Sequence, residues 1–228
     1  MFNNKKISLV IPCYNEEKGI ENILSAKPWF IDEVIVVDNG STDNTAEVAR
    51  RRGAIIVHER IRGYGRALQS GFSKASGDII ISLDGDNTYP VQETQKLISC
   101  MKDKRYDFVV GYRYPLINKK AQFAVNRAAN YFISFLVKVF FKIPLSDSQS
   151  GMMAFEKSIL DKIKSGNTGM GFSQEIKINA FLNRDLRCGE VHIPYSSRIG
   201  KVKFRMKDAI GNLYSVIRLY LQLKFKKT

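Results

Sequence analysis

The chain of 228 residues is 44% hydrophobic and 25% charged, which is the composition of a globular domain of ordinary size. Its 36 lysines and arginines outnumber its 22 aspartates and glutamates, and the net charge of +14 indicates a polyanionic partner: nucleic acid, an anionic membrane surface or a phosphorylated substrate. Three cysteines without CxxC spacing indicate reduced thiols rather than a disulfide framework or a zinc site. The sequence shows no run long enough to predict a transmembrane helix and no signal-peptide core, so we expect a cytoplasmic protein.

The first half of the chain alternates strands with helices. Strands are predicted at 7–11, 33–37, 54–57 and 79–83, and helices at 16–26, 41–53 and 66–75. We expect Pro12 to end the first strand, and Ser41 or Thr42 to cap the second helix. This alternation predicts βαβ units in a mainly parallel sheet.

The second half has a looser pattern. Helices are predicted at 91–102, 118–141, 157–163, 173–182 and 207–226, and strands at 108–111 and 189–194, with a short strand after the loop that begins at Ser146. The apolar stretch 131–141 is either a buried core helix or an interfacial one. The last helix combines an apolar stripe with basic residues, so we expect one domain over 1–204 followed by an amphipathic basic helix over 205–228. That helix either packs on the core or lies on a membrane surface.

Two carboxylates, Asp84 and Asp86, follow a strand that reads as buried on both faces. Such a pair can offer hard oxygen ligands to Mg²⁺ or Mn²⁺, although aspartate and glycine also form ordinary solvated turns. Two other strands end in the polar clusters 12–17 and 38–41. Because the carboxyl ends of parallel strands share one edge of a sheet, we expect all three clusters to meet in one cleft.

The motifs VIPCYNEE, VVDNGSTD, RGYGRALQSGF and SGDIIISLDGDNTYP, in this order and spacing, resemble the N-terminal half of family 2 glycosyltransferases with the GT-A fold. The closest likeness is to the branch of dolichol-phosphate mannosyltransferase and the polyprenyl-phosphate glycosyltransferases. The resemblance is strong over 7–115 and weaker over 116–204. It implies a Rossmann-like α/β domain with a mainly parallel mixed sheet, in which 1–115 binds a nucleotide sugar and 116–204 binds the acceptor.

The resemblance also implies roles for individual residues. Pro12, Tyr14 and Glu16 would hold the base and ribose of the nucleotide, and Asp38, otherwise a helix cap, would face the nucleoside. Asp84 and Asp86, with Gly85 between them, would bind the metal on the diphosphate. The branch often has a glutamine where this chain has Thr88, so ligation by that position stays open, and Asn87 or Thr88 would instead orient a water.

Basic residues in the second half complete the implied site. Arg113 and Arg127 would contact the acceptor phosphate and, with Asp86, act in catalysis, while Arg198 and Lys203, near Lys201, would contact the donor diphosphate. For each of these basic residues a solvated surface charge is the alternative. Two acidic residues, Asp147 and Glu175, stand at family positions without the context of a general base. His58 and His192 read as structural, without a partner motif.

These residues predict a metal-dependent, inverting hexosyltransferase that moves a sugar from GDP-mannose or UDP-glucose, or a similar donor, to a polyprenyl (dolichyl) phosphate at the cytosolic face of a membrane. Such an acceptor is already ionised near neutral pH, so it needs no general base. The protein would be peripheral there or depend on a membrane-protein partner. The alternatives are transfer to a saccharide or glycolipid hydroxyl, with Asp147 or Glu175 near the acceptor, and, outside enzymes, a basic nucleic-acid-binding module.

Overall fold

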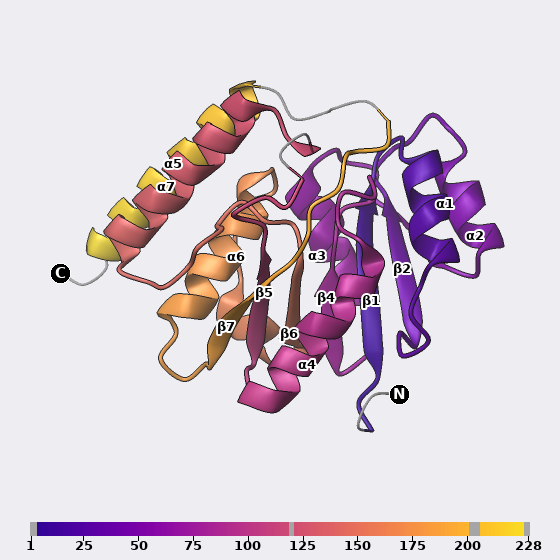
Figure 1. The fold of residues 1–228 in the computed structure, drawn as a ribbon, viewed down its shortest axis with the longest axis horizontal. Coiled ribbons are helices and arrows are strands. Elements are labelled where there is room, and N and C mark those ends of the chain that lie inside the picture. The colour runs from indigo at the N-terminus through magenta and orange to yellow at the C-terminus, as the bar shows by residue number, and fades with distance from the viewer. Residues whose placement is uncertain (1–3, 119–120, 201–205, 226–228) are drawn as a thin grey trace.

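The computed structural model describes residues 4–118, 121–200 and 206–225 as one seven-stranded sheet with helices on both faces (Figure 1). The strands are β1 (Ile7–Cys13), β2 (Glu33–Asp38), β3 (Ile55–His58), β4 (Ile79–Ser82), β5 (Phe108–Tyr112), β6 (Met153–Glu156) and β7 (Cys188–His192). The α-helices are α1 (Glu17–Ser25), α2 (Thr45–Arg51), α3 (Tyr64–Lys74), α4 (Thr94–Lys104), α5 (Ala124–Phe141), α6 (Gly171–Leu182) and α7 (Met206–Phe225). Two 3₁₀ segments, η1 (Val91–Glu93) and η3 (Lys157–Ile163), join them.

The strand order in the sheet is β3-β2-β1-β4-β6-β5-β7. β6 runs antiparallel to both of its neighbours, and the other pairs are parallel, so the sheet is mixed and mainly parallel, as predicted. The central strands are buried on both faces because successive side chains enter different cores: Ile79 and Ile81 join one hydrophobic cluster, and Ile80 joins the other.

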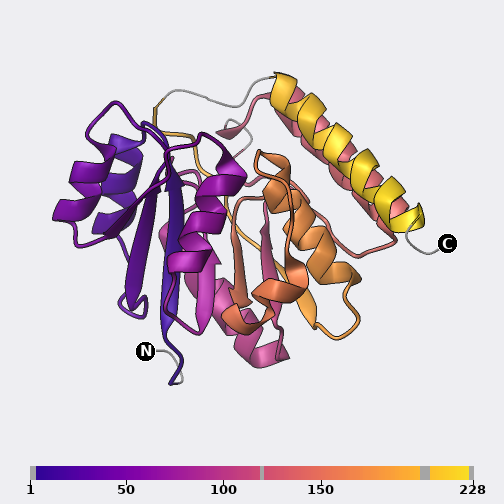
Figure 2. The same ribbon diagram turned by 180° about the vertical axis from the view of Figure 1, so that it is seen from behind.

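Two helical layers cover the sheet. Helices α1, α2 and α4 pack their apolar faces on one side, and α3 and α6 pack on the other, which Figure 2 shows from behind. Helices α5 and α7 lie side by side along one end of the molecule, next to α6 (Figure 1). The carboxyl ends of β1, β2 and β4 therefore share one edge of the sheet.

The prediction that Pro12 ends the first strand is wrong, because β1 continues to Cys13. The backbone oxygen of Cys13 accepts a hydrogen bond from Asn39 N, so the backbone of Pro12, one residue earlier, is directed toward β4. The register between β1 and β4 ends at Val10 and Ser82, before this point. Proline, which has no N–H, is tolerated there because no ladder bond is required.

Three predicted helices also differ from the structure. Helix α2 begins at Thr45 because Ser41 and Thr42 do not cap it: their hydroxyl oxygens accept hydrogen bonds from Asn15 instead. Helix α5 begins at Ala124, not at 118, since Phe123 is extended. The segment 157–163 is a 3₁₀ helix.

Helices α5 and α7 are each half-buried. On α5, Ile133 and Val137 point into the core, while an outward stripe of large apolar residues is 50–66% exposed: Val125, Phe132, Phe135 and Val139. On α7, Val216 and Leu219 are buried, while the outward stripe comprises Ile210, Tyr214, Ile217, Leu221 and Phe225. The buried-core alternative given for 131–141 therefore holds for one face of α5, and the interfacial position stays a prediction. The division of the chain at 204/205 stays a prediction.

Candidate active site

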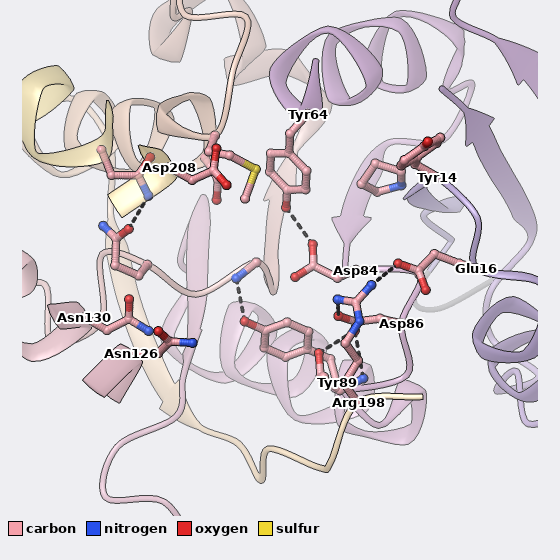
Figure 3. Close-up of a pocket in the computed structure, with 18 of the residues that line it drawn as sticks. Tyr14, Glu16, Tyr64, Asp84, Asp86, Tyr89, Asn126, Asn130, Arg198 and Asp208 are labelled. Carbon is pink, nitrogen blue, oxygen red and sulfur yellow. Dashed lines mark hydrogen bonds and ion pairs between the residues drawn. The ribbon is translucent and has the colours of Figure 1, made fainter. Parts of the chain in front are cut away.

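A cleft of about 460 Å³ opens at the edge of the sheet where β1, β2 and β4 end. Residues from all three polar clusters line it, including Tyr14, Asn39 and Asp84. Figure 3 shows Tyr14 and Glu16 on one side, Asn126, Asn130 and Asp208 on the other, and Asp84, Asp86 and Arg198 between them. The predicted convergence of the strand ends is therefore present.

Asp84 lies at the centre of the cleft. Its Oδ1 accepts a 2.7 Å hydrogen bond from the hydroxyl of Tyr64, the first residue of α3. Burial and the neighbouring Asp86 carboxylate raise the pKa of Asp84 to about 6, and the Tyr64 hydrogen bond opposes this rise. Two carboxylates are thus held close together with their mutual repulsion only partly offset.

Asp86 is oriented from two sides. The backbone N and hydroxyl of Thr88 donate to its Oδ1 over 3.0 and 2.6 Å, so in this structure Thr88 holds the carboxylate in place. Arg198 donates to Asp86 Oδ2 and to Glu16 Oε1 and so bridges the two carboxylates (Figure 3). The residue after Arg198 also contacts this aspartate, because Ile199 N donates a hydrogen bond to Asp86 O over 3.1 Å.

Glycines let the backbone approach this loop closely. A Cβ on Gly19 of α1 would lie 2.3 Å from Gly85 O, and a Cβ on Gly85 would lie 2.5 Å from Cys13 Sγ. A Cβ on Gly151, before β6, would lie 2.5 Å from Asp84 Oδ2. The positions of both carboxylates therefore depend on glycine, which has no Cβ atom, at these three neighbouring positions.

Arg113 lines the cleft at the end of β5 and is paired with a buried carboxylate. Its Nε and Nη2 donate to Asp147 over 2.7 and 2.9 Å, and its guanidinium lies 5.1 Å from the centre of the Tyr195 ring. The arginine keeps the pKa of Asp147 below its usual range despite full burial. Asp147 is 0% exposed and absent from the cleft lining among the described residues, so it is poorly placed to act as a base.

Glu175 is also engaged away from the cleft. Its carboxylate accepts hydrogen bonds from Asn167 Nδ2 (3.0 Å), Arg218 Nη2 (2.8 Å) and the Ser215 hydroxyl, which ties α6 to α7. These donors keep the pKa of Glu175 low against the effect of burial.

Of the remaining predicted residues, some line the cleft and others do not. Pro12 and Tyr14 line the cleft, and Arg62, which the sequence did not single out, stacks over the Tyr14 ring at 3.9 Å. Asp38, 8% exposed, accepts from Ser41 N, and His58 Nδ1 lies 3.3 Å from its carboxylate, so His58 has a partner that its sequence context does not indicate.

Two predicted residues are not among the described residues that line the cleft. They are Asp38, at the end of β2, and Arg127, in the first turn of α5. Lys201 and Lys203 lie outside the described residues.

The model of the family described as Glycosyl transferase family 2 matches residues 8–164. The chain belongs to glycosyltransferase family 2. Two relatives are also similar to this chain, and the first of them is aligned with nearly all of it. Dolichyl-phosphate hexose transferase of Haloferax volcanii is 31% identical and aligned over 96% of each chain. UDP-N-acetylglucosamine–dolichyl-phosphate N-acetylglucosaminyltransferase of Methanococcus voltae is 30% identical, over 69% of this chain and 72% of its own.

Solved structures share the GT-A fold of this family 2 glycosyltransferase. Glucosyl-3-phosphoglycerate synthase from Mycobacterium tuberculosis, in complex with Mg²⁺ and UDP, superposes with a TM-score of 0.74 at 23% identity, covering 96% of this chain and 79% of that one. The same enzyme with Mn²⁺, UDP and phosphoglyceric acid gives a TM-score of 0.73 at 24% identity.

The family 2 glycosyltransferase cleft also contains residues that the motifs did not single out. Tyr64 lies between Gly63 and Gly65 in the RGYGRALQSGF motif, and Tyr89, whose hydroxyl accepts from Gly151 N over 2.7 Å, lies within the DGDNTYP motif. Their position next to glycines and aspartates was a usable signal. Asn212 and Asp208 on α7 had none, because only the tertiary fold brings the C-terminal helix to the cleft.

Proposed function

We propose that this chain is an inverting, metal-dependent hexosyltransferase that uses a nucleotide sugar and transfers its sugar to a polyprenyl phosphate. The observation that carries the proposal is the pair Asp84 and Asp86, which lies at the centre of the cleft with Arg198 beside it. Their oxygens fit a hard divalent cation, since Mg²⁺ and Mn²⁺ are commonly held by one or two carboxylates plus substrate phosphates. Burial and repulsion from Asp86 raise the pKa of Asp84, and a bound cation would relieve that repulsion.

The donor would lie along the cleft from β1 toward β6. Tyr14, Glu16 and Pro12 line the end proposed for the base and ribose, and the diphosphate would reach Asp84 and Asp86. A bound Mg²⁺ or Mn²⁺ would neutralise charge that develops on the departing nucleoside diphosphate. Arg198, which spans Glu16 and Asp86 here, is the described cation best placed to contact that diphosphate, with Lys203 as its proposed partner.

The proposed acceptor is a phosphate carried by a lipid. The relatives named as dolichyl-phosphate transferases support this choice. A phosphate oxygen is ionised near neutral pH and can attack the anomeric carbon in a single, inverting displacement without a general base. The engagement of Asp147 and Glu175 with Arg113 and Arg218 weakens the alternative of a hydroxyl acceptor. Arg113 and Arg127 are the proposed contacts of the acceptor phosphate.

The lipid would be met at a membrane surface. Among the described residues, no helix has the length and apolar character needed to span a bilayer. The outward stripes of α5 and α7 instead suit an interfacial position, with basic side chains such as Lys138 and Lys224 near them. The proposal places the protein at the cytosolic face of a membrane, either as a peripheral protein or together with a membrane-protein partner.

Transfer of labelled sugar from GDP-mannose, UDP-glucose or UDP-N-acetylglucosamine into organic-extractable polyprenyl phosphate tests the proposal. We expect label in the lipid from one donor with Mg²⁺ or Mn²⁺, and loss of label with EDTA. Asp86→Ala should lower transfer by at least about 100-fold, because it removes a ligand and the partner of Arg198. Donor binding without any lipid labelling would contradict the acceptor class.

A second variant keeps both carboxylates. Gly151→Ala places its Cβ 2.5 Å from Asp84 Oδ2 and should lower transfer about tenfold or more by displacing that carboxylate. Gly166→Ala is the matched control, since a Cβ there meets nothing within 4 Å. Equal activity of the two variants would show that the position of Asp84 does not matter.

A further inference from the structure

Three amide side chains from three different elements form a hydrogen-bonded ring on the cleft wall. Asn212 Nδ2 of α7 donates to Gln149 Oε1 over 2.7 Å, Gln149 Nε2 donates to Gln174 Oε1 of α6, and Gln174 Nε2 donates to the backbone oxygen of Asn212 over 3.1 Å. All three residues line the cleft. We call them the amide ring.

One backbone group fixes the orientation of every amide in the ring. The Asn212 carbonyl oxygen accepts only, so it requires the NH₂ of Gln174, and the Oε1 of Gln174 must then face Gln149. The NH₂ of Gln149 consequently faces Gln174, and its Oε1 faces the NH₂ of Asn212. Asn212 Oδ1 has no hydrogen-bond partner among the described residues although its atom is buried. The ring is thus a preoriented set of neutral donors and acceptors.

The two arginines near the cleft centre are already paired with carboxylates. Arg113 and Arg198, the cations near the cleft centre, are paired with Asp147 and with Glu16 and Asp86, respectively. Asp208, from the first turn of α7, lies on the same side of the pocket as Asn126 and Asn130 (Figure 3). Amide and carboxylate groups are good hydrogen-bond partners for sugar hydroxyls.

The ring also has the right position along the donor. Gln149 stands two residues before Gly151, which touches Asp84 closely enough that a Cβ would lie 2.5 Å from the carboxylate. A sugar attached to a diphosphate at Asp84 and Asp86 would therefore come next to the loop that carries Gln149. Gln174 and Asn212 lie outside the residues 8–164 that the family model matches.

We propose that the amide ring of Gln149, Gln174 and Asn212 binds the hexose of the donor and determines which sugar is accepted. The proposal rests on the proposed function. It places sugar selection partly on α7, the helix whose other face carries the exposed apolar stripe.

The test is a calorimetric measurement of affinity with Mn²⁺ present. It compares UDP and GDP with four nucleotide sugars: UDP-glucose, UDP-galactose, UDP-N-acetylglucosamine and GDP-mannose. In Gln149→Leu, which keeps the size of a partly exposed side chain, we expect nucleoside diphosphate affinity within twofold of wild type. Affinity for the preferred nucleotide sugar should fall about tenfold, as expected for one or two lost hydrogen bonds. Discrimination between glucose and galactose donors should shrink as well.

Asn212→Ala provides a second variant should Gln149→Leu fail to fold, and Gln92→Leu, at an exposed position of η1, is the matched control. Unchanged ratios of nucleotide-sugar to nucleoside diphosphate affinity in the folded variants would overturn the proposal. A raised KM for polyprenyl phosphate alone would also overturn it, by assigning the ring to the acceptor. Absence of nucleotide binding in the wild type would instead overturn the proposed function, and this inference with it.

Discussion

At the scale of single residues, Lys177 is a buried base beneath the cleft that the proposed chemistry does not use. It is 0% exposed, and its Nζ donates to Ser150 O. Burial, with a smaller effect from Arg113, lowers the pKa of Lys177 from 10.5 to about 7, although Asp147 opposes the shift. The loop that carries Gln149 and Gly151 is thus supported by a lysine that is partly neutral near pH 7.

This pKa makes stability depend on pH. The unfolded chain keeps the lysine protonated up to about pH 10.5, whereas the folded chain releases the proton near pH 7. Between these values the unfolded state binds more protons, so the contribution of Lys177 to the free energy of unfolding rises with pH. We expect the urea midpoint of Lys177→Met to rise less from pH 7 to pH 9 than that of wild type.

Lys74→Met, at an exposed position on α3, serves as the control for this comparison. Its midpoint should follow the wild-type pH profile. Parallel profiles for Lys177→Met and wild type would show that the lysine keeps an ordinary pKa in the folded protein.

At the scale of elements, α5 and α7 present apolar side chains that the fold does not cover. Phe135 is 60% exposed on α5, so Phe135→Ser should leave the core intact. The variant should bind phosphatidylglycerol-containing vesicles about tenfold more weakly, because it no longer buries an aromatic side chain in the membrane. Co-sedimentation with the vesicles measures the change. Trp29→Ser, at a position 81% exposed outside these helices, is the matched control. Equal loss in both variants would argue against a role for α5.

Elements were predicted from the sequence where local pattern decides them. The apolar run 79–83 defined β4, and alternation with helices gave the parallel half of the sheet. The antiparallel placement of β6 between β4 and β5 has no local signal, because pairing partners depend on the whole chain. Helix starts were missed where side chains such as Ser41 bond to a distant residue, Asn15, instead of their own helix.

The site residues were predictable from the sequence only where they belong to a local motif. Asp84, Asp86 and Glu16 follow or flank strands with clear patterns, and the resemblance gave Arg198. The exposed or buried state of Arg127 and Asp38 was not predictable, since the direction of a side chain on a helix or strand end depends on its packing. The three residues of the amide ring lie 25, 38 and 63 positions from one another in the chain, so no single motif contains them.

At the scale of the whole molecule, the net charge of +14 and the apolar faces of α5 and α7 would make separable contributions to the proposed membrane binding. Charge attraction to an anionic surface is screened by salt, with a Debye length of about 8 Å at physiological ionic strength, whereas apolar burial is not. We therefore expect binding to phosphatidylglycerol vesicles to fall several-fold as NaCl rises and to level off above zero. In Phe135→Ser this salt-resistant remainder should shrink, while the salt-sensitive part stays the same. Vesicles of phosphatidylcholine alone should show only the remainder, at every salt concentration. If binding to both vesicle types does not respond to salt, the apolar faces alone account for the interaction. The excess of basic residues would then serve to bind the phosphates of the substrates.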